Sequence, residues 1–220
     1  MAAEPRRIGW IGAGRMGYEL MLRLLAAGYD LAVWNRTRAK AEPLAEHGAT
    51  IVDGPRDLAD RDLVVTMVSS SSVFEDVTIG SSGLFSSGSG PRVLVDSSTV
   101  SAEASQRVAA EAAKFDTALL AAPVSGNPNV VKSGQLTTVV SGDGTAFDYA
   151  LPVLETFGSK VTYVGSGDEA RLVKMCHNVL LGVVTQSLAE ITVLAERAGV
   201  SRADFLEFIN SSVMGSVFTR

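Results

Sequence analysis

The segment Gly12–Gly17 has the spacing G-x-G-x-x-G, which can bind the pyrophosphate of a dinucleotide. It follows an apolar stretch, Arg7–Ile11, and opens a stretch, Arg15–Ala27, with apolar residues at helical spacing. The first two glycines let the backbone approach the phosphates, which the amides at the helix N-terminus stabilise, and the third permits close helix packing. This context favours a dinucleotide-binding loop over a turn with only a structural role. The cofactor residues predicted in this loop are Gly12, Gly14, Arg15, Met16 and Gly17.

The residues after the second predicted strand, Leu31–Trp34, indicate which dinucleotide is bound. An NAD site usually has an acidic residue there, which accepts a hydrogen bond from the ribose 2′-hydroxyl. This chain has Asn35, Arg36 and Thr37 instead. No carboxylate would repel a 2′-phosphate, and Arg36 could bind one with charge-assisted bonds worth about 1.5–3 kcal/mol. We therefore predict NADP, held by these three residues and by Val68, although Arg36 could also be an ordinary surface arginine.

Three further segments carry polar side chains that must be considered together. Asp96–Ser101 and Ala122–Gly126 lie at the carboxyl ends of predicted strands, where open α/β sheets bind their ligands. In the third segment, Lys174 and Asn178 are four residues apart and share one face of a predicted helix. A lysine on an otherwise apolar stripe is either functional or a snorkelling or salt-bridged side chain.

A parallel sheet would position these residues. Arg7–Ile11, the glycine turn, the first helix and Leu31–Trp34 form a βαβ pattern. Leu63–Val68 and Val93–Val95 are uninterrupted apolar runs, typical of strands covered by helices on both faces. We predict an α/β fold with a doubly wound parallel sheet.

The other elements expected in this part of the chain follow from capping residues and apolar runs. Asn35 and Thr37 provide turn and N-cap oxygens for a helix, and Ser101 caps another helix that ends near Lys114. We expect surface loops at Ser69–Ser72 and Gly80–Gly90, and strands at Ala118–Val124 and Leu136–Val140, with a helix and a strand that end near Val164.

A second region begins near residue 166. Gly167–Ala198 is apolar on nearly every face, with a predicted capping box of Ser166 and Glu169 and a stop at Gly199. Such a helix would be about 48 Å long and should be buried on several sides. Only one more helix, Ala203–Asn210, is predicted, which is too little to cover it. We expect domains at 1–165 and 166–220, a second domain that is incomplete at the C-terminus, and a partner subunit that makes at least a homodimer.

Four motifs in this order resemble the β-hydroxyacid dehydrogenase family, which includes 3-hydroxyisobutyrate dehydrogenase, tartronate semialdehyde reductase and glyoxylate reductase. They are Ile11–Gly17, Asp96–Ser101, Ala122–Gly126, and Lys174–Asn178 followed by Leu188–Glu190. The resemblance covers essentially the whole chain. It implies a Rossmann domain and a helical domain with the substrate between them, and hydride exchange between a nicotinamide and a small hydroxy acid or the matching aldehyde or keto acid.

The resemblance also implies roles for individual residues. Lys174 matches the lysine that donates and accepts the proton, which agrees with a pKa lowered by burial. Asn178 matches a substrate-holding asparagine, Ser125 and Gly126 match the carboxylate-binding pair, and Thr99 matches a residue beside the nicotinamide.

The chain departs from the family pattern in several places. Family members often have a second glycine where Asn127 stands and an acidic residue where Ala121 stands, which leaves the substrate open. They also continue through further helices with a Lys-Asp pair at the substrate mouth, so the catalytic chamber is expected to be incomplete here.

Other functions share parts of this pattern. Val173–Asn178 is similar to the motif of 6-phosphogluconate dehydrogenase, but Leu181 replaces the glutamate that a decarboxylating enzyme needs. His177 is therefore expected to be a helix residue at the domain junction, with a contact to the substrate as the alternative. Imine reductases have the same architecture but typically carry aspartate or tyrosine in place of Lys174. A non-catalytic NADP(H)-binding protein is the alternative from a different class.

Composition excludes several classes. The 220 residues include 24 acidic and 19 basic ones, a net charge of −5, without the basic block that nucleic-acid binding requires. One cysteine and two scattered histidines predict neither a disulfide nor a metal site. The short apolar stretch after Arg7 is too glycine-rich for an export signal, and no apolar run is long enough to cross a membrane. We expect a cytoplasmic protein without metal, nucleic acid or membrane partners.

Overall fold

The computed structural model describes residues 4–216 and 219. The chain divides into two compact units, Met1–Lys174 and Met175–Arg220.

A six-stranded sheet with the order β3-β2-β1-β4-β5-β6 forms the centre of the first unit, and all its neighbouring strands are parallel. Its strands are β1 (Arg7–Ile11), β2 (Asp30–Trp34), β3 (Thr50–Ile51), β4 (Leu63–Thr66), β5 (Val93–Asp96) and β6 (Ala118–Ala121). The order reverses between β1 and β4, and ligands bind beyond the carboxyl ends of strands at such a reversal. The predicted doubly wound Rossmann sheet is confirmed.

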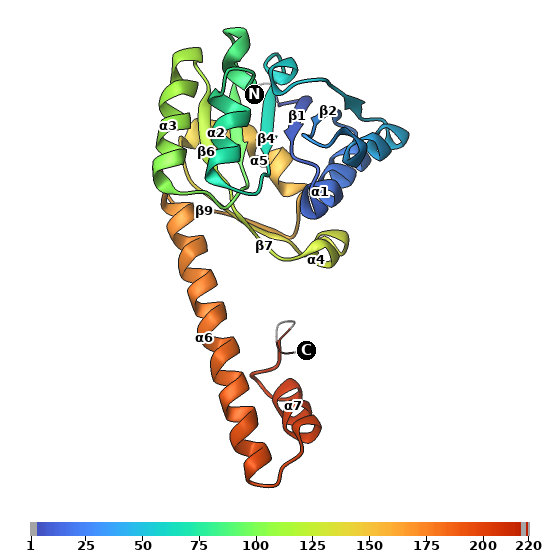
Figure 1. Cartoon of the computed structure of the whole chain (residues 1–220), viewed down its shortest axis with the longest axis vertical. Helices are drawn as coiled ribbons and strands as arrows, with labels where there is room; N and C mark the ends of the chain where they lie inside the picture. The colour runs from blue at the N-terminus through green and yellow to red at the C-terminus, as the bar shows by residue number, and fades with distance from the viewer. Residues whose placement is uncertain (1–3, 217–218, 220) are drawn as a thin grey trace. The chain divides into compact units, whose positions relative to one another are not determined.

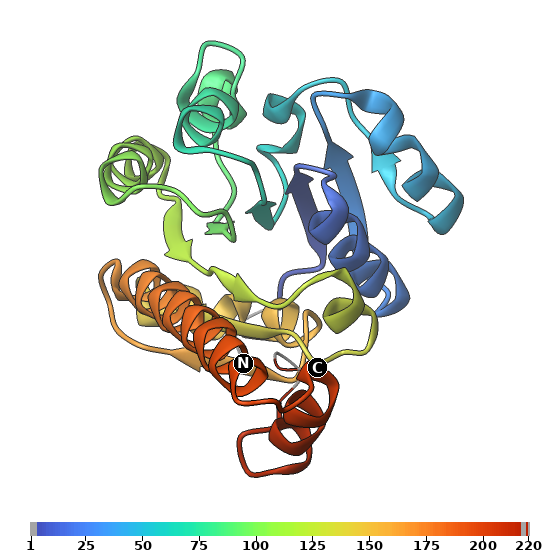
Figure 2. The ribbon, with the colours of Figure 1, turned by 60° about the horizontal axis from the view of Figure 1, so that its bottom comes forward.

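Helices cover both faces of this sheet (Figures 1 and 2). On one face, α1 (Arg15–Ala26) and α5 (Gly144–Glu155) share a core with Leu63 and Val65 of β4. On the other face, α2 (Ser71–Ile79) and α3 (Ala102–Ala112) share a core with Val64. Because successive residues of β4 are buried on opposite faces, the strand is apolar without alternation. Short 3-10 helices at Arg38–Lys40, Glu42–His47, Pro55–Leu58, Leu84–Ser87 and Ala113–Phe115 lie between these elements.

A second, three-stranded sheet was not predicted. It contains β7 (Val124–Ser125), β8 (Thr137–Val140) and β9 (Lys160–Tyr163), with β7 antiparallel to β8 and β8 parallel to β9. The prediction of one strand over Ala118–Val124 is therefore wrong. The chain passes from one sheet to the other at Pro123, which has no N–H to donate to a ladder.

Two predictions about loops and caps also need correction. Ser71 and Ser72 form the first turn of α2 and are not in a loop, because the Ser70 hydroxyl caps this helix by accepting a hydrogen bond from Val73 N–H at 3.3 Å. Thr37 precedes a 3-10 helix without capping it through its side chain.

The helix α6 (Glu169–Arg197) begins in the first unit and continues through the second. It matches the predicted helix to within two residues at each end. The capping box differs from the prediction, since the Glu169 carboxylate accepts a hydrogen bond from Gly167 N–H at 2.8 Å and not from the expected Ser166. Gly199, with φ +88°, follows the helix as predicted.

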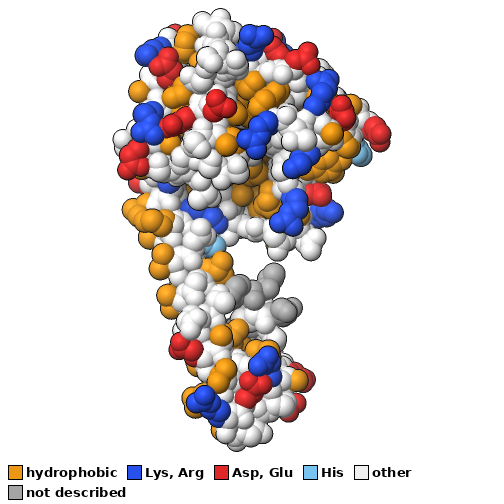
Figure 3. Space-filling view, in the orientation of Figure 1, with side chains coloured by type: hydrophobic (Ala, Val, Ile, Leu, Met, Phe, Trp, Pro, Cys, Tyr) orange, Lys and Arg blue, Asp and Glu red, His pale blue; other side chains and the backbone are white. Residues whose placement is uncertain are grey.

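The second unit holds most of α6 and the helix α7 (Arg202–Ser211), which Ser201 caps. The predicted burial of α6 on several sides is not found within one chain. Its apolar side chains are largely exposed, as the hydrophobic surface along it in Figure 3 shows. Among the described helices, α6 alone is long and apolar enough to cross a membrane by length and composition, which is a weak indication because core helices of soluble proteins share these properties.

Candidate active site

The glycine loop between β1 and α1 has the geometry of a phosphate-binding turn. Gly12 has φ +110°, and a Cβ there would lie 2.3 Å from the Met67 carbonyl oxygen. At Gly17 a Cβ would lie 2.4 Å from the Gly12 carbonyl oxygen, so both positions require glycine. A Cβ at Gly14 would meet no described atom within 4 Å, and no described side chain caps the first turn of α1. The amides of that turn therefore have no side-chain cap among the described residues, and a helix N-terminus of this kind attracts phosphate groups.

Trp10 in strand β1 holds this loop through a hydrogen bond to its backbone. Its side chain is fully buried in β1, and its indole Nε1–H donates a 2.9 Å hydrogen bond to the Gly12 carbonyl. This bond satisfies the indole and orients the peptide group after Gly12. This contribution could not be predicted from the sequence, because a tryptophan in an apolar strand looks like an ordinary core residue.

Asn35 connects the glycine loop with the loop after β2. Its Oδ1 accepts a hydrogen bond from Ala13 N–H at 2.8 Å, and its Nδ2 donates to the Thr37 carbonyl at 2.8 Å. The Asn35 side chain therefore fixes the two loops against each other.

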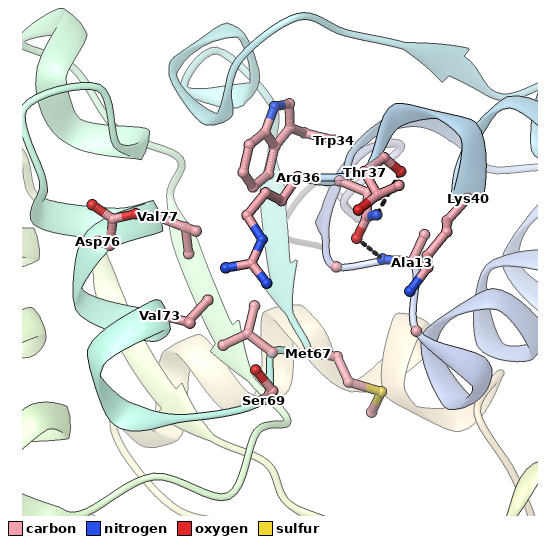
Figure 4. Close-up of a pocket in the computed structure, with 14 residues that line it drawn as sticks. Ala13, Trp34, Arg36, Thr37, Lys40, Met67, Ser69, Val73, Asp76 and Val77 are labelled. Atoms are coloured by element: carbon pink, nitrogen blue, oxygen red, sulfur yellow. Dashed lines mark hydrogen bonds between the residues drawn. The ribbon is translucent and has the colours of Figure 1, made fainter.

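A cavity of about 200 Å³ lies between the glycine loop, the loop after β2 and the start of α2 (Figure 4). The guanidinium of Arg36 points into this cavity, toward Val73 and Val77. Lys40, which was not predicted to be a cofactor residue, also lines the cavity, as does Asp76 of α2. The complete lining is Gly12, Ala13, Gly14, Trp34, Asn35, Arg36, Thr37, Lys40, Met67, Val68, Ser69, Val73, Asp76 and Val77.

The cavity brings together most of the predicted cofactor residues. Gly12, Gly14, Asn35–Thr37 and Val68 line it. Arg15, Met16 and Gly17 lie in the first turn of α1 and are outside its lining, as is Thr99, an exposed residue in the loop after β5. Val68 N–H donates to the Ser98 hydroxyl at 2.9 Å, which connects the cavity to that loop.

The predicted carboxylate-binding pair lies at the end of β7. Ser125 is half-buried, and Gly126 has φ +149°. Asn127, which stands where the family often has glycine, caps the short helix α4 (Pro128–Lys132) by accepting hydrogen bonds from Asn129 N–H and Val130 N–H. The departure at Asn127 therefore has a structural explanation.

Lys174 is half-buried in the second turn of α6, and burial lowers the pKa of its amine. Asn178 follows four residues later in the same helix but belongs to the second unit, where it is exposed, 3.4 Å from Nδ1 of His177. Within the described residues, no cluster of three or more His, Cys, Asp and Glu side chains could hold a metal ion.

The doubly wound sheet and the glycine-loop cavity define a dinucleotide-binding protein, and the comparisons with known proteins show that it is an oxidoreductase. Residues 7–165 match the model of the NAD binding domain of 6-phosphogluconate dehydrogenase. The chain belongs to the β-hydroxyacid dehydrogenase family. It is 34% identical to the uncharacterized oxidoreductase YfjR of Bacillus subtilis over 96% of this chain and 74% of that protein. It is 30% identical to 3-hydroxyisobutyrate dehydrogenase of Pseudomonas aeruginosa over 95% of this chain and 70% of that enzyme.

Solved structures show the same fold. Mycobacterium tuberculosis 3-hydroxyisobutyrate dehydrogenase with L-serine has a TM-score of 0.84 and 27% identity, and the match covers 99% of this chain and 73% of that one. Psf3 in complex with NADP+ and 2-OPP has a TM-score of 0.84 and 26% identity, over 96% and 75%. An imine reductase from Pseudomonas sp. shares the fold at a TM-score of 0.79 and 24% identity, over 94% and 72%. These matches span about three quarters of each neighbour.

Proposed function

We propose that the protein is an NADP(H)-dependent 3-hydroxyacid dehydrogenase or reductase, with Lys174 as its general acid and base. Its substrate would be a small β-hydroxy acid or the matching aldehyde or keto acid. The observation that carries the proposal is the half-buried Lys174, whose pKa burial lowers, in a helix that begins beside the loop after β5. An alcohol oxidation needs a base at the hydroxyl oxygen, and a carbonyl reduction needs an acid there.

The glycine-loop cavity supports NADP(H) as the cofactor. The amides at the start of α1, including those of Arg15 and Met16, would hold the pyrophosphate, and Arg36 with Lys40 would hold the 2′-phosphate. When bound, the nicotinamide supplies or accepts the hydride. Psf3, a structural neighbour, was solved with NADP+, which supports the same choice here.

The remaining residues are proposed to hold the substrate. The Ser125 hydroxyl and Gly126 N–H would donate hydrogen bonds to its carboxylate, Thr99 would lie beside the nicotinamide, and Asn178 would orient the reacting oxygen. A mycobacterial neighbour was solved with L-serine, which is itself a β-hydroxy acid.

We further propose that residues 1–165 are the cofactor domain, that 166–220 contribute to substrate binding and dimerisation, and that the protein acts in the cytoplasm as a homodimer. The boundary between residues 165 and 166 is supported by the family match, which ends at residue 165. A cytoplasmic location would keep the exposed Cys176 thiol reduced.

An NADPH-consumption screen over small aldehyde and keto acids, run beside imines, tests the reaction class. On the confirmed substrate, Lys174→Ala should lower kcat by about 10²–10⁴ while NADPH affinity changes little. Lys174→Arg should fail as well, because arginine keeps the charge but does not release a proton near neutral pH. Asn178→Ala should mainly raise KM. If Lys174→Arg retains most of the turnover, Lys174 is a binding residue, and turnover of imines alone would favour an imine reductase.

A further inference from the structure

The carboxylate of Asp96 is fully buried at the end of β5 and has its partner in another element. Its Oδ2 lies 2.8 Å from Nη2 of Arg171, whose side chain in the first turn of α6 is 9% exposed. Its Oδ1 accepts hydrogen bonds from Thr66 Oγ1 at 2.7 Å and from Ser98 N–H at 3.1 Å. A buried ion pair with these additional bonds favours one arrangement of the elements that carry it.

The other nitrogens of Arg171 also have partners. Its Nε donates to Asp168 Oδ1 at 3.0 Å, and its Nη1 donates to the Ser98 carbonyl at 3.4 Å. The Ser98 hydroxyl accepts from Val68 N–H, which lines the cofactor cavity. One guanidinium thus joins the end of β5, the loop after it and the start of α6.

Two residues of the proposed mechanism are next to this network in the chain. Lys174 lies three residues after Arg171, one turn further along α6, and Thr99 directly follows Ser98. We propose that Arg171 is a positioning residue, which holds the Lys174 turn of α6 in a fixed place relative to the loop that carries Thr99. This inference rests on the proposed function and deepens it, since Arg171 would act only through Lys174 and that loop.

The role needs the shape of arginine and not only its charge. The planar guanidinium donates in three directions, to Asp96, Asp168 and Ser98, whereas a lysine ammonium is a compact charge at the end of a flexible chain. Arg171→Lys keeps the buried charge of Asp96 paired but loses this simultaneous bonding, so it is the most direct test.

In Arg171→Lys, kcat should fall by about 10- to 100-fold, because a small misplacement of a proton-transfer group is costly, while the Kd for NADPH changes by less than about twofold. A second readout needs no cofactor and no turnover. The Lys174 amine is acylated with an amine-reactive reagent at a series of pH values and quantified by mass spectrometry. In the variant, the rise of labelling should move to higher pH, because a loosened turn exposes the amine to water.

Arg61→Lys is the matched control. Arg61 pairs with Asp30 at 3.0 Å, and its side chain is 15% exposed, but the pair lies at the amino ends of β2 and β4. The Arg61→Lys variant should leave kcat and Lys174 labelling unchanged. If Arg171→Lys does not fold, Asp168→Asn, whose side chain is 29% exposed in the wild type, should shift both readouts in the same direction to a smaller extent.

Wild-type kcat and labelling in a folded Arg171 variant would overturn the inference. A lower Tm with both readouts unchanged would also overturn it, since the pair would then be only structural. If Lys174→Arg is active, the proposed role of Lys174 is wrong instead. Failure of the Arg171 inference can therefore be distinguished from failure of the proposed function.

Discussion

Two arginines in the loop after β2 have different surroundings. Arg38 lies 2.7 Å from Asp53 and 3.6 Å from Glu42, whereas Arg36 forms no ion pair within the described part of the chain. A guanidinium that is already paired with carboxylates must give up these ion pairs before it can bind a phosphate, which weakens the binding. Arg36, whose guanidinium points into the cavity, is therefore the better candidate for a 2′-phosphate.

Arg36→Ala should weaken NADPH binding by about 10- to 150-fold, the equivalent of the 1.5–3 kcal/mol that charge-assisted hydrogen bonds contribute. NADH affinity should hardly change, because NADH has no 2′-phosphate. Isothermal titration calorimetry with both cofactors measures the ratio of the NADPH and NADH affinities. Arg38→Ala is the control, in which this ratio should not change. An unchanged ratio in Arg36→Ala would show that this arginine is an ordinary surface residue.

The lowered pKa of Lys174 predicts opposite pH dependences for the two reaction directions. Oxidation needs the neutral amine, so kcat should rise as the pH increases through the lowered pKa. Reduction needs the protonated amine, so kcat should fall over the same range. Profiles of kcat against pH, measured in both directions with one substrate pair, check this. In Lys174→Ala the change of kcat through this pKa should disappear. If the same pH dependence of kcat persists in this variant, it is caused by the titration of a residue other than Lys174.

The sequence revealed part of this site because some residue types are informative alone. The glycine spacing predicts a dinucleotide-binding loop, and in the structure this loop and Asn35–Thr37 line one cavity. The roles of Trp10 and Arg171 could not be predicted, because they depend on partners found only in the folded chain. Asp96, for example, precedes Arg171 by 75 positions.

At the level of single elements, α4 explains a departure from the family pattern. Its N-cap is Asn127, whose side-chain oxygen accepts hydrogen bonds from the backbone at Asn129 and Val130. An asparagine committed to this cap stabilises the helix that directly follows Ser125 and Gly126. It need not contact substrate itself.

Asn127→Ala should lower the free energy of unfolding by about 1 kcal/mol, the usual cost of losing an N-cap, without raising the substrate KM more than about twofold. Chemical denaturation and steady-state kinetics measure the two effects. Ser101→Ala, which removes the cap of α3, is the comparison for stability alone. A large rise in KM with unchanged stability would instead make Asn127 a substrate contact.

The elements predicted correctly are those with a strong local signal. The βαβ unit was recognised from apolar runs on either side of a glycine turn, and α3 from its Ser101 cap. The split between β6 and β7 was missed because Val124 is as apolar as the strand before it, so only Pro123 marked the change of sheet. The helix α2 was not predicted, because the run of serines at its start is typical of a loop and the cap by Ser70 is evident only in the structure.

At the scale of the whole molecule, the main question is what covers α6. Its exposed apolar side chains include Val179 and Leu180, each 62% exposed, and Leu194, 66% exposed. Apolar surface of this extent is typical of an interaction site. A second copy of the chain and a membrane are the two candidates, and the proposed function favours the first.

Sedimentation velocity at micromolar concentration should show a dimer or a larger closed assembly. Leu180→Glu should shift it toward monomer, because a charge on the apolar surface opposes association, whereas Glu207→Lys on α7 is the matched surface control. Flotation with phospholipid vesicles tests the membrane candidate and should leave the protein at the bottom of the gradient. A monomer that floats with vesicles would reverse the conclusion.

The buried indole of Trp10, which is hydrogen-bonded to the glycine loop, gives the protein a built-in optical probe. The chain has two tryptophans, and the second, Trp34, lines the cofactor cavity, while its indole donates to the Asp53 carbonyl at 3.1 Å. Indole emission overlaps the absorption band of reduced nicotinamide, so energy transfer should quench the ultraviolet emission when NADPH is bound. Because Trp10 is shielded from solvent and Trp34 is only partly buried, collisional quenchers should separate the two signals. Occupancy of the cavity can then be followed on unlabelled protein, even before its substrate is known.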